Sequence, residues 1–260
     1  MSELVWQDET VQLATGTIRV ARRGDGPPLV VLHQDVGHPG NLPLYDDLAR
    51  RFTVYIPDLP GFGNSDRLDF ARHPRDLAIV LRALLNSLRL DAITLLGLGF
   101  GGWLAAEMAT MDEQHLKHLV LVGAAGIRPK SGFILDQMML SHVEYVQAGF
   151  HNLEHFERVY GTEPSDAQKK AWDFNREMIA RVAWRPYMFS LQLPPLLGNV
   201  SVPATVVWGR HDRIVPVECG AAFARALPNA ALEIVDDAGH FVEIEQPEVL
   251  AGIVHRPVSV

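Results

Sequence analysis

The stretch that decides the fold covers residues 95–103 and reads LLGLGFGGW. It opens inside an apolar run, residues 92–96, of the kind found in strands buried on both faces of a parallel sheet. From residue 102 to residue 111, apolar residues recur at helical spacing. Glycines crowd the junction, and glycine permits both close approach of two backbones and a positive φ. The stretch therefore predicts a tight turn from a buried strand into a helix.

The same alternation of segments extends over most of the chain. Further apolar runs predict strands at residues 29–32, 52–56, 119–122, 204–208 and 231–235. Helical spacing predicts helices over residues 76–88, around 221–227 and over 247–255. Ahead of them, residues 11–21 alternate between apolar and polar, which indicates half-buried antiparallel strands. This order of elements predicts an α/β fold with a doubly wound, mostly parallel sheet.

The interval from about residue 129 to residue 199 breaks this rhythm. It lacks β-branched runs and is rich in methionine, aromatic and charged residues. Residues 134–140 and 167–182 have the spacing of helices, and prolines near residue 195 mark the return to the sheet. We therefore predict a core domain of residues 1–128 and 200–260 and an inserted helical cap subdomain of residues 129–199.

Composition excludes several classes of partner. The chain has 260 residues and a net charge of −8, which disfavours binding to nucleic acid or to an anionic membrane. No apolar run approaches the roughly 18 residues of a membrane span, and the acidic N-terminus has no secretory pattern. The single cysteine, Cys219, excludes an internal disulfide. We predict a cytoplasmic protein whose partner is a small molecule, and the oligomeric state stays open.

The glycine-rich turn resembles the nucleophile elbow, G-x-S-x-G, of the α/β-hydrolases. Gly97 and Gly101 match the flanks, and Gly99 stands at the nucleophile position. Residues 208–216 resemble the acid loop of that family, with Asp212 as the acid, and residues 237–241 resemble its histidine loop, with His240. Elbow, acid and histidine follow in the chain order of the family. The resemblance covers nearly the whole chain and is nearest to small capped esterases, lactonases and carbon–carbon bond hydrolases. It implies an α/β-hydrolase fold.

In that family the histidine deprotonates the serine, and the acid orients the histidine. The resemblance therefore implies His240 as a general base and Asp212 as its orienter. Glycine has no side chain, so no acyl-enzyme forms at Gly99. The expected chemistry therefore lacks the covalent serine step of the family.

A second departure lies in the loop that follows the strand at residues 29–32. The family usually has His-Gly-x there, and this chain has His33-Gln34-Asp35. The resemblance implies an oxyanion site formed by the backbone N–H groups of Asp35 and Phe100 beside Gln34, with His33 in a structural role beneath the loop. An ionised Asp35 facing the pocket would oppose an oxyanion. Asp35 therefore points away, is protonated, or serves a different chemistry.

Three interpretations of Gly99 stay open. In the first, the protein is an enzyme acting on a small apolar carbonyl compound, such as an ester, lactone or diketone. His240 then activates a water in the space of the serine hydroxyl, or takes a proton from the substrate, and Asp35 supplies a second carboxylate. In the second, the protein is a pseudo-hydrolase that binds a ligand or a partner. In the third, glycine is a replacement that traps substrate. No spacing of metal ligands appears, so we predict neither a metal nor an organic cofactor.

Overall fold

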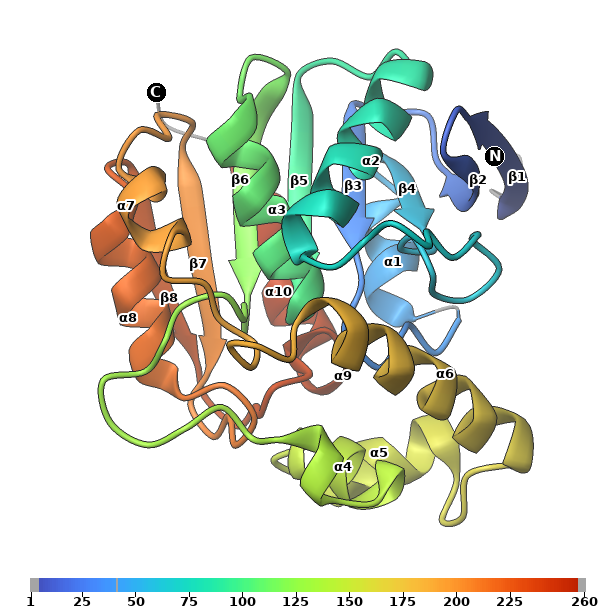
Figure 1. The fold of residues 1–260 in the computed structure, drawn as a ribbon, viewed down its shortest axis with the longest axis vertical. Helices are drawn as coiled ribbons and strands as arrows, with labels where there is room; N and C mark the ends of the chain where they lie inside the picture. The colour runs from blue at the N-terminus through green and yellow to red at the C-terminus, as the bar shows by residue number, and fades with distance from the viewer. Residues whose placement is uncertain (1–4, 41, 257–260) are drawn as a thin grey trace.

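The computed structural model of the protein describes residues 5–40 and 42–256. In this part of the chain, eight strands form one sheet in the order β1-β2-β4-β3-β5-β6-β7-β8. β2 pairs antiparallel with β1 and β4, and the other neighbours are parallel. The strands are β1 (Gln7–Leu13), β2 (Gly16–Arg23), β3 (Pro28–Leu32), β4 (Thr53–Pro57), β5 (Ile93–Leu98), β6 (Leu116–Val122), β7 (Ala204–Gly209) and β8 (Ala230–Val235). The predicted mostly parallel α/β sheet is confirmed (Figure 1).

Helices cover both faces of this sheet (Figure 1). They are α1 (Pro43–Leu48), α2 (Pro74–Ser87), α3 (Phe100–Met111), α8 (Val217–Ala226), α9 (Val242–Glu245) and α10 (Pro247–Val254). Buried residues of α2, α3 and α8 share one apolar cluster, and those of α1 and α10 belong to a second. In β3, Val30 and Leu32 enter the first cluster, whereas Leu29 and Val31 enter the second. Because both faces of the strand are covered, its sequence is apolar without alternation.

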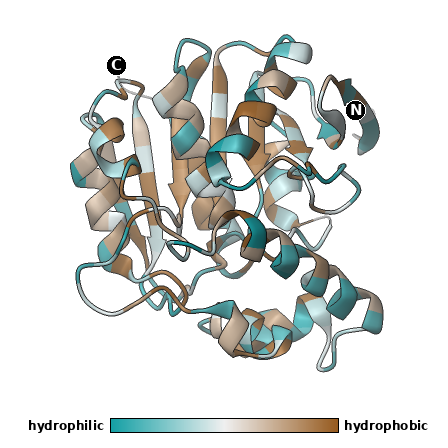
Figure 2. Cartoon of the chain, in the orientation of Figure 1, coloured by the Kyte–Doolittle hydropathy of each residue, from teal (hydrophilic) through white to brown (hydrophobic). Residues whose placement is uncertain are grey.

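The hydropathy of the elements follows this layering. In Figure 2 the strands of the central sheet are mostly hydrophobic, and the helices show hydrophilic residues on their outer sides. Within the described ranges, no helix combines the length and the apolarity that crossing a bilayer requires.

The segment between β6 and β7 carries α4 (His142–Ala148), α5 (Leu153–Tyr160), α6 (Asp166–Val182) and α7 (Leu193–Leu197). In Figure 1, α4, α5 and α6 lie together beyond the carboxyl ends of the strands, apart from the helices that flank the sheet. The helix predicted over residues 167–182 is confirmed as α6. We use the name cap for residues 129–199, the boundaries suggested by the sequence.

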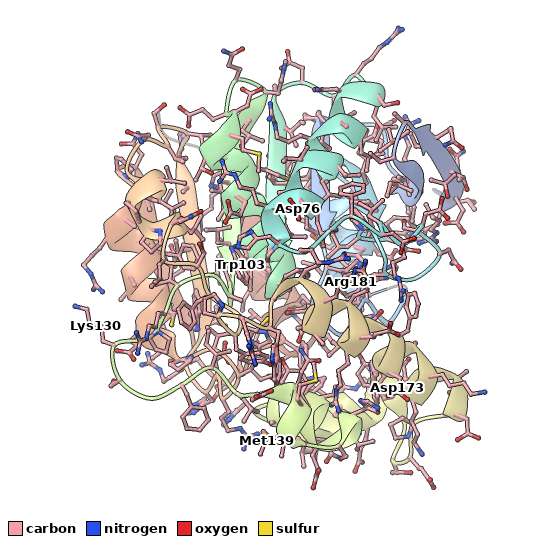
Figure 3. The ribbon with its side chains drawn as sticks, in the orientation of Figure 1. Asp76, Trp103, Lys130, Met139, Asp173 and Arg181 are labelled. Atoms are coloured by element: carbon pink, nitrogen blue, oxygen red, sulfur yellow. The ribbon has the colours of Figure 1, made fainter. Side chains whose placement is uncertain are left out.

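The helix predicted over residues 134–140 is wrong. Only a short 3-10 turn, Gln137–Met139, forms there. The Asp136 carboxylate accepts the N–H of Met138 at 2.8 Å, and the backbone of Asp136 and Leu140 is extended on either side of the turn. The apolar spacing was misleading because Met139 is 79% exposed instead of packing in a core; Figure 3 shows it at the edge of the cap.

Candidate active site

The turn after β5 is a tight strand-to-helix elbow, as predicted. Gly99 lies between β5 and α3 with φ 51° and ψ −112°, a conformation that favours glycine. The flanking glycines allow close packing. A Cβ on Gly97 would meet the Cα of Gly102 at 2.5 Å, and a Cβ on Gly101 would meet the carbonyl oxygen of Leu32 at 2.2 Å. The elbow therefore holds residue 99 at the carboxyl edge of the sheet.

Asp212 and His240 meet beside this elbow. Asp212 follows β7, and its Oδ1 accepts the backbone N–H groups of Ile214 and Val215 at 2.8 and 2.9 Å. Its Oδ2 lies 2.8 Å from Nδ1 of His240, which follows β8. Both side chains are buried. Because Nδ1 donates to Asp212, the other ring nitrogen, Nε2, faces the elbow. Nε2 lies 2.9 Å from the point where a Cβ on Gly99 would be.

Negative groups surround the His240 imidazole. Burial alone lowers the pKa of His240, but the charge and hydrogen bond of Asp212 and the charges of Asp35 and Glu243 raise it above its ordinary value. The protonated imidazole is therefore stabilised in this site. A histidine of this kind holds a proton once it has accepted one, as a general base has to do during a reaction.

The side chain of Gln34 fills the space that a nucleophile would use. A Cβ built on Gly99 would lie only 1.8 Å from Oε1 of Gln34, far inside contact distance. The amide is fixed from its other end, because Nε2 of Gln34 donates to Oε1 of Glu243 at 3.0 Å. Gln34 and Glu243 are both buried. Glycine at 99 and glutamine at 34 are therefore sterically linked.

Asp35 points inward beneath the cap. Its Oδ2 accepts the hydroxyl of Tyr145 at 2.7 Å and Nε2 of Gln137 at 3.1 Å. Burial raises the pKa of the Asp35 carboxyl, and the charge of His240 and the hydrogen bond from Tyr145 offset only part of that rise. The backbone N–H groups of Asp35 and Val36 lie toward this carboxylate and also lower its pKa, but its Oδ1 has no hydrogen-bond partner in the described residues. The N–H expected to stabilise an oxyanion is thus turned toward the side chain of its own residue.

Phe100 begins α3, so its backbone N–H belongs to the first helical turn, where N–H groups have no partner within the helix. The phenyl ring is fully buried and packs edge-on against Trp103, which Figure 3 labels on α3. The other proposed oxyanion donor therefore sits at the elbow itself, next to Gly99.

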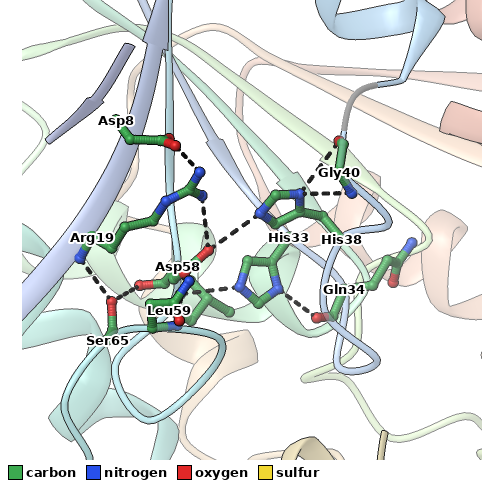
Figure 4. A network of polar contacts seen from close by, with 10 residues as sticks. Asp8, Arg19, His33, Gln34, His38, Gly40, Asp58, Leu59 and Ser65 are labelled. Carbon is green, nitrogen blue, oxygen red and sulfur yellow. Dashed lines mark hydrogen bonds and ion pairs between the residues drawn. The ribbon is translucent and has the colours of Figure 1, made fainter. Parts of the chain in front are cut away.

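His33 ties the loop after β3 to the loop after β4. Its Nε2 accepts the N–H of Leu59 at 3.0 Å, so Nδ1 carries the proton and donates to the carbonyl oxygen of Gln34 at 2.7 Å (Figure 4). Burial, together with the charge of His38, lowers the pKa of His33 to about 4, which keeps the ring neutral. In this position His33 holds the backbone of Gln34 in place.

The comparison with known families agrees with this geometry. A model of the family described as alpha/beta hydrolase fold matches residues 27–247, a range that contains Gly99, Asp212 and His240. The chain belongs to the α/β-hydrolase family. Its resemblance to that family, expected from the elbow and the two loops, is confirmed.

Proteins of similar sequence include some with and some without an assigned reaction. An uncharacterized protein of Mycobacterium tuberculosis is 27% identical, covering 96% of this chain and 80% of that protein. The 2-hydroxy-6-oxononadienedioate/2-hydroxy-6-oxononatrienedioate hydrolase 1 of Dechloromonas aromatica is also 27% identical, covering 77% of this chain and 74% of that enzyme.

Solved structures give the same fold. A serine hydrolase involved in carbazole degradation superposes with a TM-score of 0.77 at 22% identity, covering 96% of this chain and 97% of that one. A meta-cleavage product hydrolase from Pseudomonas fluorescens superposes with a TM-score of 0.79 at 19% identity, covering 95% of both chains. At these identities the likeness concerns the α/β-hydrolase fold alone.

Sequence reasoning missed two features of this α/β-hydrolase site. It placed Gln34 near an oxyanion but did not foresee that its side chain occupies the nucleophile's space. It also did not select Glu243, which lies in α9 only three residues after His240. The available signal was the pair of departures from the family pattern, glutamine for glycine at 34 and glycine for serine at 99.

Proposed function

We propose that the protein is an enzyme that acts on a small, apolar carbonyl compound, such as an ester, lactone or diketone, without a covalent serine step. His240 serves as the general base, and Asp212 orients it. The observation that carries this proposal is the buried His240–Asp212 contact of 2.8 Å, which is retained although Gly99 supplies no nucleophile. A fold kept only for binding has no need of a base poised at the elbow.

The relatives support a small carbonyl compound as the substrate. The Dechloromonas relative is named as a hydrolase of hydroxy-oxo dienedioates, which are small carbonyl compounds. The backbone N–H of Phe100, in the first turn of α3, supplies a donor for a carbonyl oxygen. The proposed reaction needs no metal or organic cofactor.

The position of Gln34 constrains the path of the proton. Oε1 of Gln34 fills the space of a serine hydroxyl. We therefore propose that the group that gives its proton to His240 Nε2 is the substrate itself or a water molecule beside the substrate. In ester hydrolysis, a water there attacks the carbonyl carbon while Nε2 takes its proton. The carbon–oxygen bond then breaks, and the imidazolium returns the proton to the leaving alcohol.

A panel of esters, lactones and β-diketones tests the proposal with the unmodified protein and His240→Ala in parallel. We expect at least one substrate whose turnover falls by about 10²–10⁴-fold in the variant, the range typical of general-base catalysis. His115→Ala, at an exposed histidine, is the matched control and should keep full activity. Equal turnover by His240→Ala would contradict the proposed base.

The occupied nucleophile space supports a second candidate, a non-catalytic ligand-binding protein. The Gln34 amide, held by Glu243, lies in the position where chemistry occurs in the family. If no member of the panel is turned over above buffer while compounds of the same classes raise the melting temperature, this second function replaces the first.

A further inference from the structure

Three buried oxygen atoms around the elbow lack a hydrogen-bond partner. They are Oε1 of Gln34, Oδ1 of Asp35 and Oε2 of Glu243. All three residues are at most 2% exposed. A buried acceptor without a partner costs about 1–3 kcal/mol, so several in one place need an explanation.

These oxygens belong to one site. Gln34 Oε1 and His240 Nε2 are both among the atoms nearest to the Cβ position of residue 99. Glu243 accepts a hydrogen bond from Gln34, and Asp35 follows Gln34 in the chain. The charges of Asp35 and Glu243 both act on His240. The three residues that carry these acceptors thus lie close to His240, whose Nε2 we propose as the base.

The side-chain donors beside these three oxygens are already engaged. Gln34 Nε2 donates to Glu243, and His240 Nδ1 donates to Asp212. Tyr145 and Gln137 both donate to Asp35. The charge of Asp35 also acts on Arg176 of α6, whose Nη1 donates to the carbonyl oxygen of Leu140 at 3.0 Å and whose Nε has no hydrogen-bond partner in the described residues. The elbow therefore offers hydrogen-bond acceptors and negative charge.

We propose that Gln34, Asp35 and Glu243 bind a hydrogen-bond donor of the substrate, a hydroxyl or an amine, and exclude a carboxylate from that position. This inference rests on the proposed function in taking the Gly99–His240 region as the ligand site. A hydroxyl or ammonium group satisfies the unpartnered oxygens, whereas a carboxylate adds a like charge to a buried acidic site. The preferred substrate therefore differs from the dienedioates named for the Dechloromonas relative.

Four aromatic probes of similar size test the head group directly. Binding of benzyl alcohol, benzylamine, benzoate and toluene is measured by ligand-observed NMR titration at pH 8. We expect one or both donor probes to bind at least ten times more tightly than toluene, and benzoate to bind more weakly than either donor. Benzoate binding as tight as that of the donors, or no donor binding more tightly than toluene, overturns the proposal.

Two variants identify the acceptors. Asp35→Asn and Glu243→Gln remove a charge at nearly constant shape, and each should weaken benzylamine binding at least tenfold and improve benzoate binding. Glu248→Gln, at an exposed glutamate of α10, is the matched control and should change neither. Unchanged probe selectivity in both folded variants also overturns the assignment. If a variant does not fold, the four-probe comparison on the unmodified protein still decides.

The failure of this inference can be distinguished from failure of the proposed function. If the donor probes bind selectively but no member of the panel is turned over, the acceptor site is supported and the enzymatic function is rejected. If turnover depends on His240 but benzoate binds as tightly as the donor probes, the enzymatic function is supported and the acceptor site is rejected.

Discussion

At residue 99 the chain has no side chain, and the amide of Gln34 uses the space that becomes free. The two residues come from different loops, yet the amide of Gln34 fits only because residue 99 lacks the serine side chain typical of the family. With glycine at 99 and glutamine at 34, His240 and Asp212 are still in hydrogen-bond contact. The chemistry of the elbow is therefore decided by a pair of residues.

This pairing predicts the result of restoring a serine. Gly99→Ser alone places a Cβ 1.8 Å from Gln34 Oε1 at a positive φ, so we expect a loss of about 1–3 kcal/mol in stability and no gain in ester hydrolysis. Gly99→Ser combined with Gln34→Gly removes the clash with Gln34 and leaves only the 2.9 Å approach to His240 Nε2. The double variant should hydrolyse p-nitrophenyl acetate with a burst and form an acyl-enzyme visible by mass spectrometry. Gln34→Gly alone is the control, and a burst from Gly99→Ser alone would contradict the steric argument.

The pH dependence of turnover follows from the His240 environment. The base has to be neutral, and its pKa is raised above 6.5, so kcat/KM should rise with pH through an inflection above that value. The same shift stabilises the fold below pH 6.5, and this contribution is lost as pH rises through the folded pKa.

Asp212→Asn removes the largest of the influences that raise this pKa, and should move the inflection of the pH–rate profile downward. Glu243 has a pKa raised by burial to about 7, so Glu243→Gln separates its titration from that of His240. An inflection at or below pH 6.5 in the unmodified protein would show that a different group acts as the base.

At the scale of elements, one carboxylate joins the cap to the core. Asp35 lies in the loop after β3, and its partners Tyr145 and Gln137 come from α4 and from the 3-10 turn before it. The loop and the cap are thus fixed relative to each other through contacts that lie inside the candidate site. A change in the cap therefore affects the groups that surround His240.

Removing one of these contacts should cost stability. For Tyr145→Phe we expect a loss of about 1.5–3 kcal/mol in the free energy of unfolding by urea, the usual value for a hydrogen bond to a charged group. Tyr160→Phe, a cap tyrosine whose hydroxyl has no hydrogen bond in the described residues, is the control. A double-mutant cycle with Asp35→Ala should show coupling of the same sign; additive effects would mean that this contact does not hold the cap.

The cap also shows where sequence patterns were insufficient. Apolar spacing predicted a helix over residues 134–140, where only a 3-10 turn forms, and α4 was not predicted. Its signal was present: Ser141 and Glu144 form a reciprocal capping box, with hydrogen bonds of 3.2 and 2.9 Å. In short helices, the capping residues were more informative than the apolar period.

At the scale of the whole molecule, the site is assembled at the carboxyl edge of the sheet. Elbow, acid and histidine come from loops after three parallel strands, which end at the same edge. That topology explains why motif order was enough to predict the fold and to bring Gly99, Asp212 and His240 to attention. It did not predict side-chain directions. The Gln34–Glu243 hydrogen bond joins residues 209 positions apart, and no local pattern records it.

The missing side chain at Gly99 has a practical consequence for how this protein would be found in a cell extract. Fluorophosphonate reagents tag members of this family when the oxygen of the elbow serine attacks their phosphorus and displaces fluoride, and glycine has no side-chain oxygen to make that attack. A labelling survey of serine hydrolases would pass over this chain even when it is abundant and folded. Its ligands have to be sought by reversible capture, with an immobilised alcohol or amine as bait.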